Sequence, residues 1–234
     1  VDCGSTSNEA INFLNQNNIQ SIIIDHHEIN KPYPKSDAII NPKKNIIYNE
    51  HSYLCATALT YFFIDILIKK TNSNFKLTNL IIYVLLATIC DVMPLRKINK
   101  TIASNVIKNY TIEDNTAFKV IFNQLDIKKK LSIDDLGYLI GPIINSGGRL
   151  GFSSYGTELL ASKDPTIIKK RSIELIKLNN KRKELEKNIL NEIDFEKIKN
   201  ENKHVIIYYN KNIHEGLIGI IAAKLKDYFN KPSI

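Results

Sequence analysis

The chain has 234 residues, of which 44% are hydrophobic, and this content predicts a globular core and excludes a disordered chain. Its net charge of +8 favours a polyanionic partner, although a solvated basic surface explains the charge equally well. No run reaches the ~18 consecutive apolar residues that a membrane span needs, so we expect no membrane partner and a cytoplasmic location.

An apolar run near the start of the chain ends on an acid and two histidines. Residues 19–24 predict a strand buried on both faces, as in a parallel sheet, and the next three residues are Asp25, His26 and His27. Val1–Cys3 is expected to end an earlier strand, which puts Asp2 at the same sheet edge. Open α/β sheets carry their sites at this edge. Taken alone, however, such residues are more often surface turns.

Apolar segments in the next part of the chain predict core elements. A short strand is expected at Ala38–Ile40, and helices are expected at Tyr53–Lys70 and Leu77–Cys90. The second helix runs into Asp91, the only charge between Leu77 and Arg96. A carboxylate in so apolar a stretch needs a partner, and we expect a metal ion or a histidine. Backbone N–H groups at the helix end are the alternative.

The second half is expected to be mainly helical. Ser132 is a predicted N-cap, and Asp164-Pro165 predicts the start of a long exposed helix that reaches about Glu192. Between them, the glycine-rich stretch Gly141–Gly151 predicts a turn and matches neither the Walker nor the dinucleotide-binding pattern. His204–Tyr209 predicts a strand, followed by a helix of small residues with His214 at its amino end.

Five segments occur in an order that identifies a family. They are Asp2-Cys3-Gly4, Asp25-His26-His27, Asp91 with Val-Met-Pro-Leu, Asn145–Gly151, and His214–Ala222. In this order they resemble the DHH phosphoesterase superfamily, and within it the RecJ family of single-strand-specific 5′→3′ DNA exonucleases. The resemblance covers essentially the whole chain. It implies an α/β fold with a parallel sheet flanked by helices (the DHH domain), a long connecting helix and the start of a smaller α/β DHHA1 lobe.

The resemblance also implies a domain plan with two departures. The DHH domain would span residues 1–160, the connecting helix 164–193 and the start of the DHHA1 domain 200–234. The family's Asp-x-Asp-x-Asp-Gly motif is absent and would have to precede Val1, and the DHHA1 lobe stops soon after its first helix. We therefore expect a fragment incomplete at both ends, which alone is weakly active or inactive.

The implied site has three groups of residues. The family's metal-ligand positions fall on Asp2, His26 and Asp91, its catalytic positions on His27 and the supporting acid Asp25, and its substrate-binding positions on Asn145, Gly148, Arg149 and His214. The implied cofactors are two divalent ions in the complete protein, usually Mn²⁺, with Mg²⁺ as the alternative. The implied partners are single-stranded DNA and repair or recombination proteins.

Two other functions stay open at this point. An oligoribonuclease or 3′-phosphoadenosine phosphatase of the same superfamily would act on short substrates. A non-catalytic nucleic-acid-binding DHH module would have lost its metal ligands, whereas the five acidic and histidine positions of this chain are intact.

Overall fold

The structure, a computed structural model, describes residues 1–201 and 203–234, apart from the side chains of residues 46–48. It is mostly helical with a small parallel sheet, which confirms the predicted α/β class. No helix in these described ranges is long and apolar enough to cross a membrane. Short 3₁₀ helices cover Ile46–His51, Thr78–Leu80 and Ile112–Asp114, and a π-helical turn covers Leu136–Ile140. The strands and α-helices are β1 (Ile22–Ile24), β2 (Ala38–Ile40), α1 (Asn8–Gln16), α2 (Ala56–Thr71), α3 (Ile81–Cys90), α4 (Lys97–Asn109), α5 (Thr116–Gln124), α6 (Ile133–Asp135), α7 (Gly141–Arg149), α8 (Ser154–Ala161), α9 (Pro165–Glu192), α10 (Phe195–Asn200) and α11 (Glu215–Phe229).

The chain forms two compact units. Unit 1 comprises residues 1–114 and 131–137, and unit 2 comprises residues 115–130 and 138–234. These units divide the chain at other positions than the domains expected from the sequence. The domain plan of 1–160, 164–193 and 200–234 therefore stays a prediction, and its last part includes Asn202, which lies outside the described residues.

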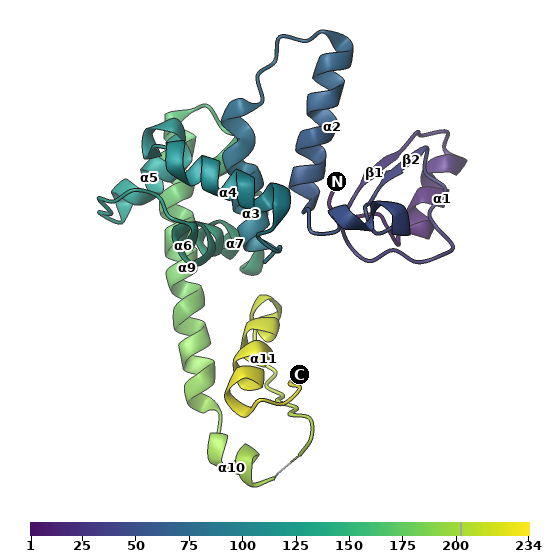
Figure 1. The fold of residues 1–234 in the computed structure, drawn as a ribbon. Helices are drawn as coiled ribbons and strands as arrows, with labels where there is room; N and C mark the ends of the chain where they lie inside the picture. Colours follow the sequence, from purple (N-terminus) through teal and green to yellow (C-terminus); the bar gives the residue numbers. More distant parts are fainter. Residues whose placement is uncertain (202) are drawn as a thin grey trace. The chain divides into compact units, whose positions relative to one another are not determined.

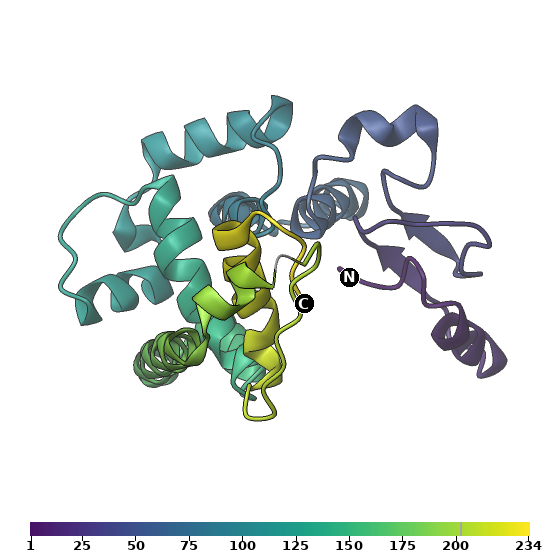
Figure 2. The same cartoon turned by 90° about the horizontal axis from the view of Figure 1, so that it is seen from below.

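In unit 1, the two short strands β1 and β2 lie side by side (Figure 2). They run parallel, with Ile24 opposite Ile40. Ile23 and Ile24 are buried, but Ile22 is 54% exposed, so the expected burial on both faces of β1 is wrong at its first residue. The expected strand at the start of the chain is not formed. Asp2 and Gly4 both have positive φ angles, which an extended strand does not allow. The segment still contacts β1, because the Asp2 N–H donates to the Ile24 carbonyl at 2.8 Å.

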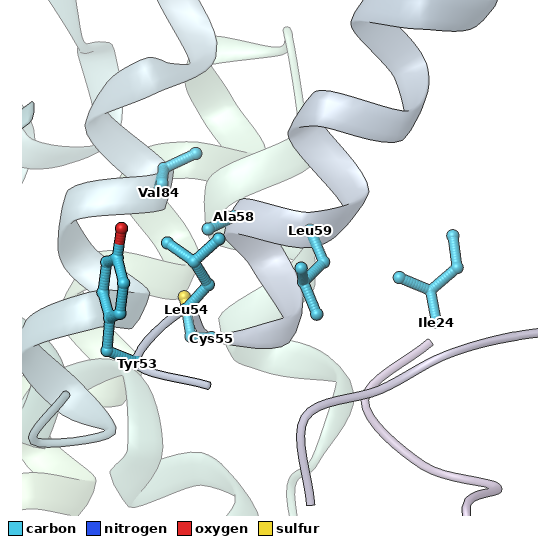
Figure 3. Close-up of a cluster of buried hydrophobic side chains, with 7 residues drawn as sticks. All are labelled: Ile24, Tyr53, Leu54, Cys55, Ala58, Leu59 and Val84. Atoms are coloured by element: carbon cyan, nitrogen blue, oxygen red, sulfur yellow. The ribbon is translucent and has the colours of Figure 1, made fainter. Parts of the chain in front are cut away.

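A buried cluster joins the helices of unit 1 to the sheet (Figure 3). Residues just before α2 and in its first turn form one cluster with Val84 of α3 and Ile24 of β1. In this cluster, Ile24 lies beside Leu59 of α2. The predicted apolar helices thus become α2 and α3, which begin slightly later than expected because Cys55 is the N-cap of α2 and a 3₁₀ turn precedes α3. This packing fixes the end of α3 relative to the end of β1.

In unit 2, the long helix α9 is the element on which the others pack (Figure 1). Its predicted start and end are confirmed: the Asp164 carboxylate accepts a hydrogen bond from the Thr166 N–H at 2.8 Å, and the helix ends at Glu192. Helices α5, α7 and α8 contact α9, and α11 contacts both α7 and α9. The end of α7 and the start of α11 therefore belong to one packed body.

Two predictions about unit 2 are wrong. The glycine-rich stretch is not a turn but the helix α7, because packing on α9 outweighs the low helix propensity of its glycines. Ser146 shows this packing, since its hydroxyl donates to the Leu175 carbonyl of α9 at 3.0 Å. In the part of the chain that the structure describes, the expected strand at His204–Tyr209 is reduced to one parallel bridge between Ile206 and Ser233, with the Ile206 N–H donating to the Pro232 carbonyl at 2.9 Å.

Candidate metal centre

Unit 1 gathers five of the predicted site residues at the carboxyl end of its sheet. Asp25 directly follows β1, and its N–H still donates to the Ile40 carbonyl of β2 at 3.0 Å. The hydrogen bond from Asp2 to Ile24 brings the start of the chain to the same point. Asp91 comes from a different element, because it is the C-cap of α3.

The side chains of these residues form a cluster of oxygen and imidazole donors. His26 Nε2 lies 3.3 Å from Asp2 Oδ1 and 3.9 Å from Asp91 Oδ2. Ligand atoms of Asp2, His26 and His27 lie within 4.8 Å of one another, as in a site that could hold a metal ion. The structure thus brings Asp2, His26 and Asp91 together as expected, and it adds His27 to the same cluster.

Asp25 is the buried centre of this cluster, with 1% of its surface exposed. One of its oxygens accepts hydrogen bonds from the His26 N–H, the His27 N–H and His27 Nδ1, the last at 2.7 Å. The other oxygen accepts from the Ser5 N–H at 3.1 Å. Burial raises the pKa of the Asp25 carboxyl, but the hydrogen bonds from Ser5 and His27 outweigh it and hold this pKa well below its usual range. Asp25 is therefore a charged acceptor that fixes the His27 ring.

The tautomer of His27 follows from this contact. Because the Asp25 carboxylate can only accept, Nδ1 of His27 carries a proton, and in the neutral ring the lone pair is on Nε2. The His27 side chain is 60% exposed, so Nε2 is accessible to a ligand. An imidazole oriented by a buried carboxylate is the usual arrangement around a metal or a phosphate.

Asp91 lies near a histidine, one of the two kinds of partner expected from the sequence, with its Oδ2 atom 3.9 Å from His26 Nε2. Its side chain is 41% exposed, however, and thus not fully buried as the apolar sequence around it suggested. Partial burial, followed by the nearby Asp2 carboxylate, raises the pKa of the Asp91 carboxyl, while His26 and His27 oppose the shift. Two carboxylates that repel each other beside an imidazole provide a donor set that a cation would stabilise.

Positive φ angles lie on both sides of the cluster. Asp2 has φ +60° and Val92, the residue after Asp91, has φ +53°. A β-branched residue rarely adopts this conformation, and such strain is typical of functional sites. One of these two positions is thus a candidate ligand, and the other directly follows one.

Two residues of this site were missed by the sequence reasoning. Ser5 and Asn41 are both buried, and the Asn41 amide donates to Ser5 Oγ at 2.8 Å and to the His27 carbonyl at 3.0 Å. One signal was available, since Asn41 follows the predicted strand Ala38–Ile40 just as Asp25 follows β1. Ser5 gives no signal of its own in the sequence.

The other four predicted site residues lie in unit 2. Asn145 and Arg149 are one helical turn apart on α7, with Gly148 between them in the sequence, so both side chains lie on the same side of the helix. Arg149 Nη1 donates to the Gly216 carbonyl at 2.9 Å, which ties α7 to the start of α11. His214 is the N-cap of α11, and its Nδ1 accepts from the Gly216 N–H at 3.1 Å. Arg149 and His214 are thereby brought to one place through Gly216.

Comparisons with known proteins match this chain to DNA-processing enzymes. Residues 1–89 match the DHH family, N-terminal domain. The single-stranded-DNA-specific exonuclease RecJ of Haemophilus influenzae is 27% identical over 100% of this chain and 43% of its own length. The chain thus spans less than half of that relative.

Two solved structures share the fold. The RecJ of Thermus thermophilus in complex with Mn²⁺ superposes with a TM-score of 0.84 at 22% identity, covering 100% of this chain and 35% of that one. An exonuclease RecJ bound to manganese superposes with a TM-score of 0.83 at 21% identity, covering 100% of this chain and 58% of that one. The fold of this chain is therefore that of RecJ, as the order of the five sequence segments predicted.

Proposed function

From the match of residues 1–89 to the DHH family and the RecJ fold of the whole chain, we propose that the protein is a metal-dependent phosphodiesterase that degrades single-stranded DNA from its 5′ end. One observation carries the proposal: the cluster of Asp2, His26 and Asp91 beside an oriented His27. Such an enzyme would act in DNA repair and recombination in the cytoplasm, where repair or recombination proteins are its expected partners.

The donor set of the cluster suits a divalent ion. Two carboxylates supply hard oxygen ligands and His26 supplies one nitrogen. This mixture suits Mn²⁺ better than Mg²⁺, which is usually bound by oxygen ligands alone. Asp2, His26 and Asp91 would hold the ion, with His27 near enough to join them. When bound, such an ion lowers the pKa of its water and offsets the charge of a phosphate.

The other residues of unit 1 orient groups around the reacting phosphate. Asp25 holds the His27 ring through Nδ1, which would leave Nε2 to bind a metal ion or the scissile phosphodiester. We assign a positioning role to Asp25 in place of the catalytic role expected from the sequence, because its buried oxygens are occupied by four donors. A fixed ring avoids the cost of ordering it during the reaction.

The residues of unit 2 provide groups for the DNA backbone. The bond to Gly216 uses one of the five N–H donors of the Arg149 guanidinium and fixes its position, which favours bidentate binding of a phosphate by other donors of the same group. Asn145, Gly148 and His214 would bind the same strand.

A cleavage assay with the protein at its full natural length tests the proposal. We expect Mn²⁺-dependent release of nucleotides from the 5′ end of a long single strand, much slower cleavage of a duplex or a dinucleotide, and loss of cleavage when EDTA is added. Faster cleavage of the dinucleotide would instead favour the oligoribonuclease or phosphatase function. Absence of Mn²⁺ binding in calorimetry would favour the non-catalytic module.

The matched variants are Asp91→Asn and Asp65→Asn. Asp91→Asn removes a proposed ligand charge and should lower both Mn²⁺ affinity and kcat by more than about 10-fold. Asp65 lies on α2, where it pairs with Lys69, so Asp65→Asn should leave both unchanged. Equal behaviour of the two variants would contradict the assignment of the site.

A further inference from the structure

The register of the sheet places Asn41 beside Asp25. Because Ile24 pairs with Ile40, the residues that follow the two strands, Asp25 and Asn41, leave the sheet next to each other. Asn41 is 8% exposed, and a buried amide is costly unless its donors and acceptor are all bonded. The structure satisfies each of them.

The contacts of Asn41 determine the orientation of its amide. Its two N–H donors bond Ser5 Oγ and the His27 carbonyl, and its oxygen accepts from the Lys43 N–H at 2.9 Å. A flipped amide would place its oxygen against the His27 carbonyl and its N–H group against the Lys43 N–H. Both arrangements are repulsive, so the amide has one stable orientation.

The partners of Asn41 are the groups that hold Asp25 and His27. Ser5 donates through its backbone N–H to the oxygen of Asp25 that faces away from the histidines. The His27 carbonyl belongs to the residue whose ring Asp25 orients. Asn41 thus joins the two ends of one chain of hydrogen bonds that runs from Ser5 through Asp25 to His27.

We propose that Asn41 is a positioning residue for the His27 imidazole, which it acts on through Ser5 and the His27 backbone. This inference rests on the proposed function, because it assigns Asn41 to the same site. Without the amide, Ser5 and the His27 carbonyl are no longer connected, and the His27 backbone can turn away from Asp25. The ring then exchanges between its two tautomers, and Nε2 no longer has a fixed direction.

The test measures the tautomer of His27 in metal-free protein. Protein labelled with ¹⁵N-histidine is studied by NMR at pH 8, and the His27 signals are identified from their loss in His27→Gln. We expect the wild type to hold the proton on Nδ1. In Asn41→Ala the His27 ring should instead populate both tautomers, and Ser5→Ala should shift it in the same direction by less. Because Ser5→Ala removes a single oxygen, it keeps the test decisive if Asn41→Ala does not fold.

The control is Asn115→Ala in unit 2. Asn115 is 7% exposed and its side chain caps α5 by accepting from the Phe118 N–H. Its loss should cost stability but leave the His27 signals unchanged. An unchanged tautomer in both Asn41→Ala and Ser5→Ala, or an equal shift in Asn115→Ala, would overturn the proposal.

A kinetic measurement gives the second readout. Asn41→Ala should lower kcat for single-strand cleavage by about 10- to 100-fold, with KM changed less than about 2-fold. Such a pattern is usual for residues that orient a site residue without contacting the substrate. An unaltered kcat would contradict the positioning role. If the wild type cleaves no phosphodiester, the proposed function fails, while the NMR measurement still decides whether Asn41 orients His27.

Discussion

Gly216 and Gly219 on α11 offer a matched pair of substitutions with opposite expected effects. A Cβ atom added at Gly216 would overlap the carbonyl oxygen of Arg149 and lie 2.9 Å from its carbonyl carbon. A Cβ added at Gly219, one turn later, meets nothing within 4 Å. We therefore predict that Gly216→Ala is strongly destabilising and Gly219→Ala is not.

The magnitude at Gly216 follows from the backbone contact. Relief of the clash requires the end of α7 and the start of α11 to separate by about 1 Å, because no flexible side chain can give way, and such overpacking costs about 1–3 kcal/mol. The separation also weakens the charged hydrogen bond from Arg149 to the Gly216 carbonyl, which is worth about 1.5–3 kcal/mol. A gain of up to ~1 kcal/mol in helix propensity opposes both costs, which leaves a net loss of about 2–4 kcal/mol.

Two measurements test this prediction: urea denaturation, and hydrogen exchange at the amides of α7 and α11 under native conditions. Gly216→Ala should lower the unfolding midpoint and increase exchange in both helices, whereas Gly219→Ala should raise stability by up to ~1 kcal/mol. Gly216→Ala should also weaken binding to single-stranded DNA, since it displaces Arg149. Equal stabilities of the two variants would refute the close contact between Gly216 and Arg149.

Three further predictions concern other parts of the chain. Ser132→Ala removes a capping box and should cost about 1 kcal/mol in urea denaturation, whereas Ser7→Ala should cost nearly nothing because the Ser7 side chain makes no cap hydrogen bond. Val92→Asn should raise the free energy of unfolding by about 0.5–1 kcal/mol, because asparagine tolerates the positive φ at this position, and an unchanged midpoint would contradict the strain. Hydrogen bonds from Ser154 and Arg171 lower the pKa of Glu158, so its contribution to stability is present above the unfolded-state pKa and is lost as the pH falls through the folded-state pKa. The wild type should therefore lose more stability than Glu158→Gln between pH 5 and pH 2, and parallel losses would exclude this role.

Local signals in the sequence were enough for the elements whose ends are set by their own residues. The Asp164-Pro165 pair and the Ser132 cap act within one turn of their helices, so α9 and α6 begin as predicted. The other elements depend on contacts between residues that are distant in the sequence. The helix α7 depends on its packing against α9, and the bridge at Ile206 depends on a partner segment near residue 233.

The same distinction applies to the candidate site. The acids and histidines of unit 1 were recognisable because each has a side chain suited to metal or phosphate chemistry, and the structure brings Asp2, His26 and Asp91 together. Ser5 and Asn41 could not be found in this way. Their roles come from hydrogen bonds across 14 or more positions of the chain, and only the place of Asn41 after a predicted strand gave a local signal.

The register of β1 and β2 has a consequence for how this sequence can vary. Residues inserted at the exposed Asn30 or Lys31 would lengthen the loop between β1 and β2 and leave Ile24 opposite Ile40, so the site would survive. One residue inserted within Ala38–Ile40 would turn every later side chain of that strand to the opposite face and direct Asn41 away from Asp25. Length changes in descendants of this chain should therefore accumulate in the loop, while the three-residue strand keeps its length.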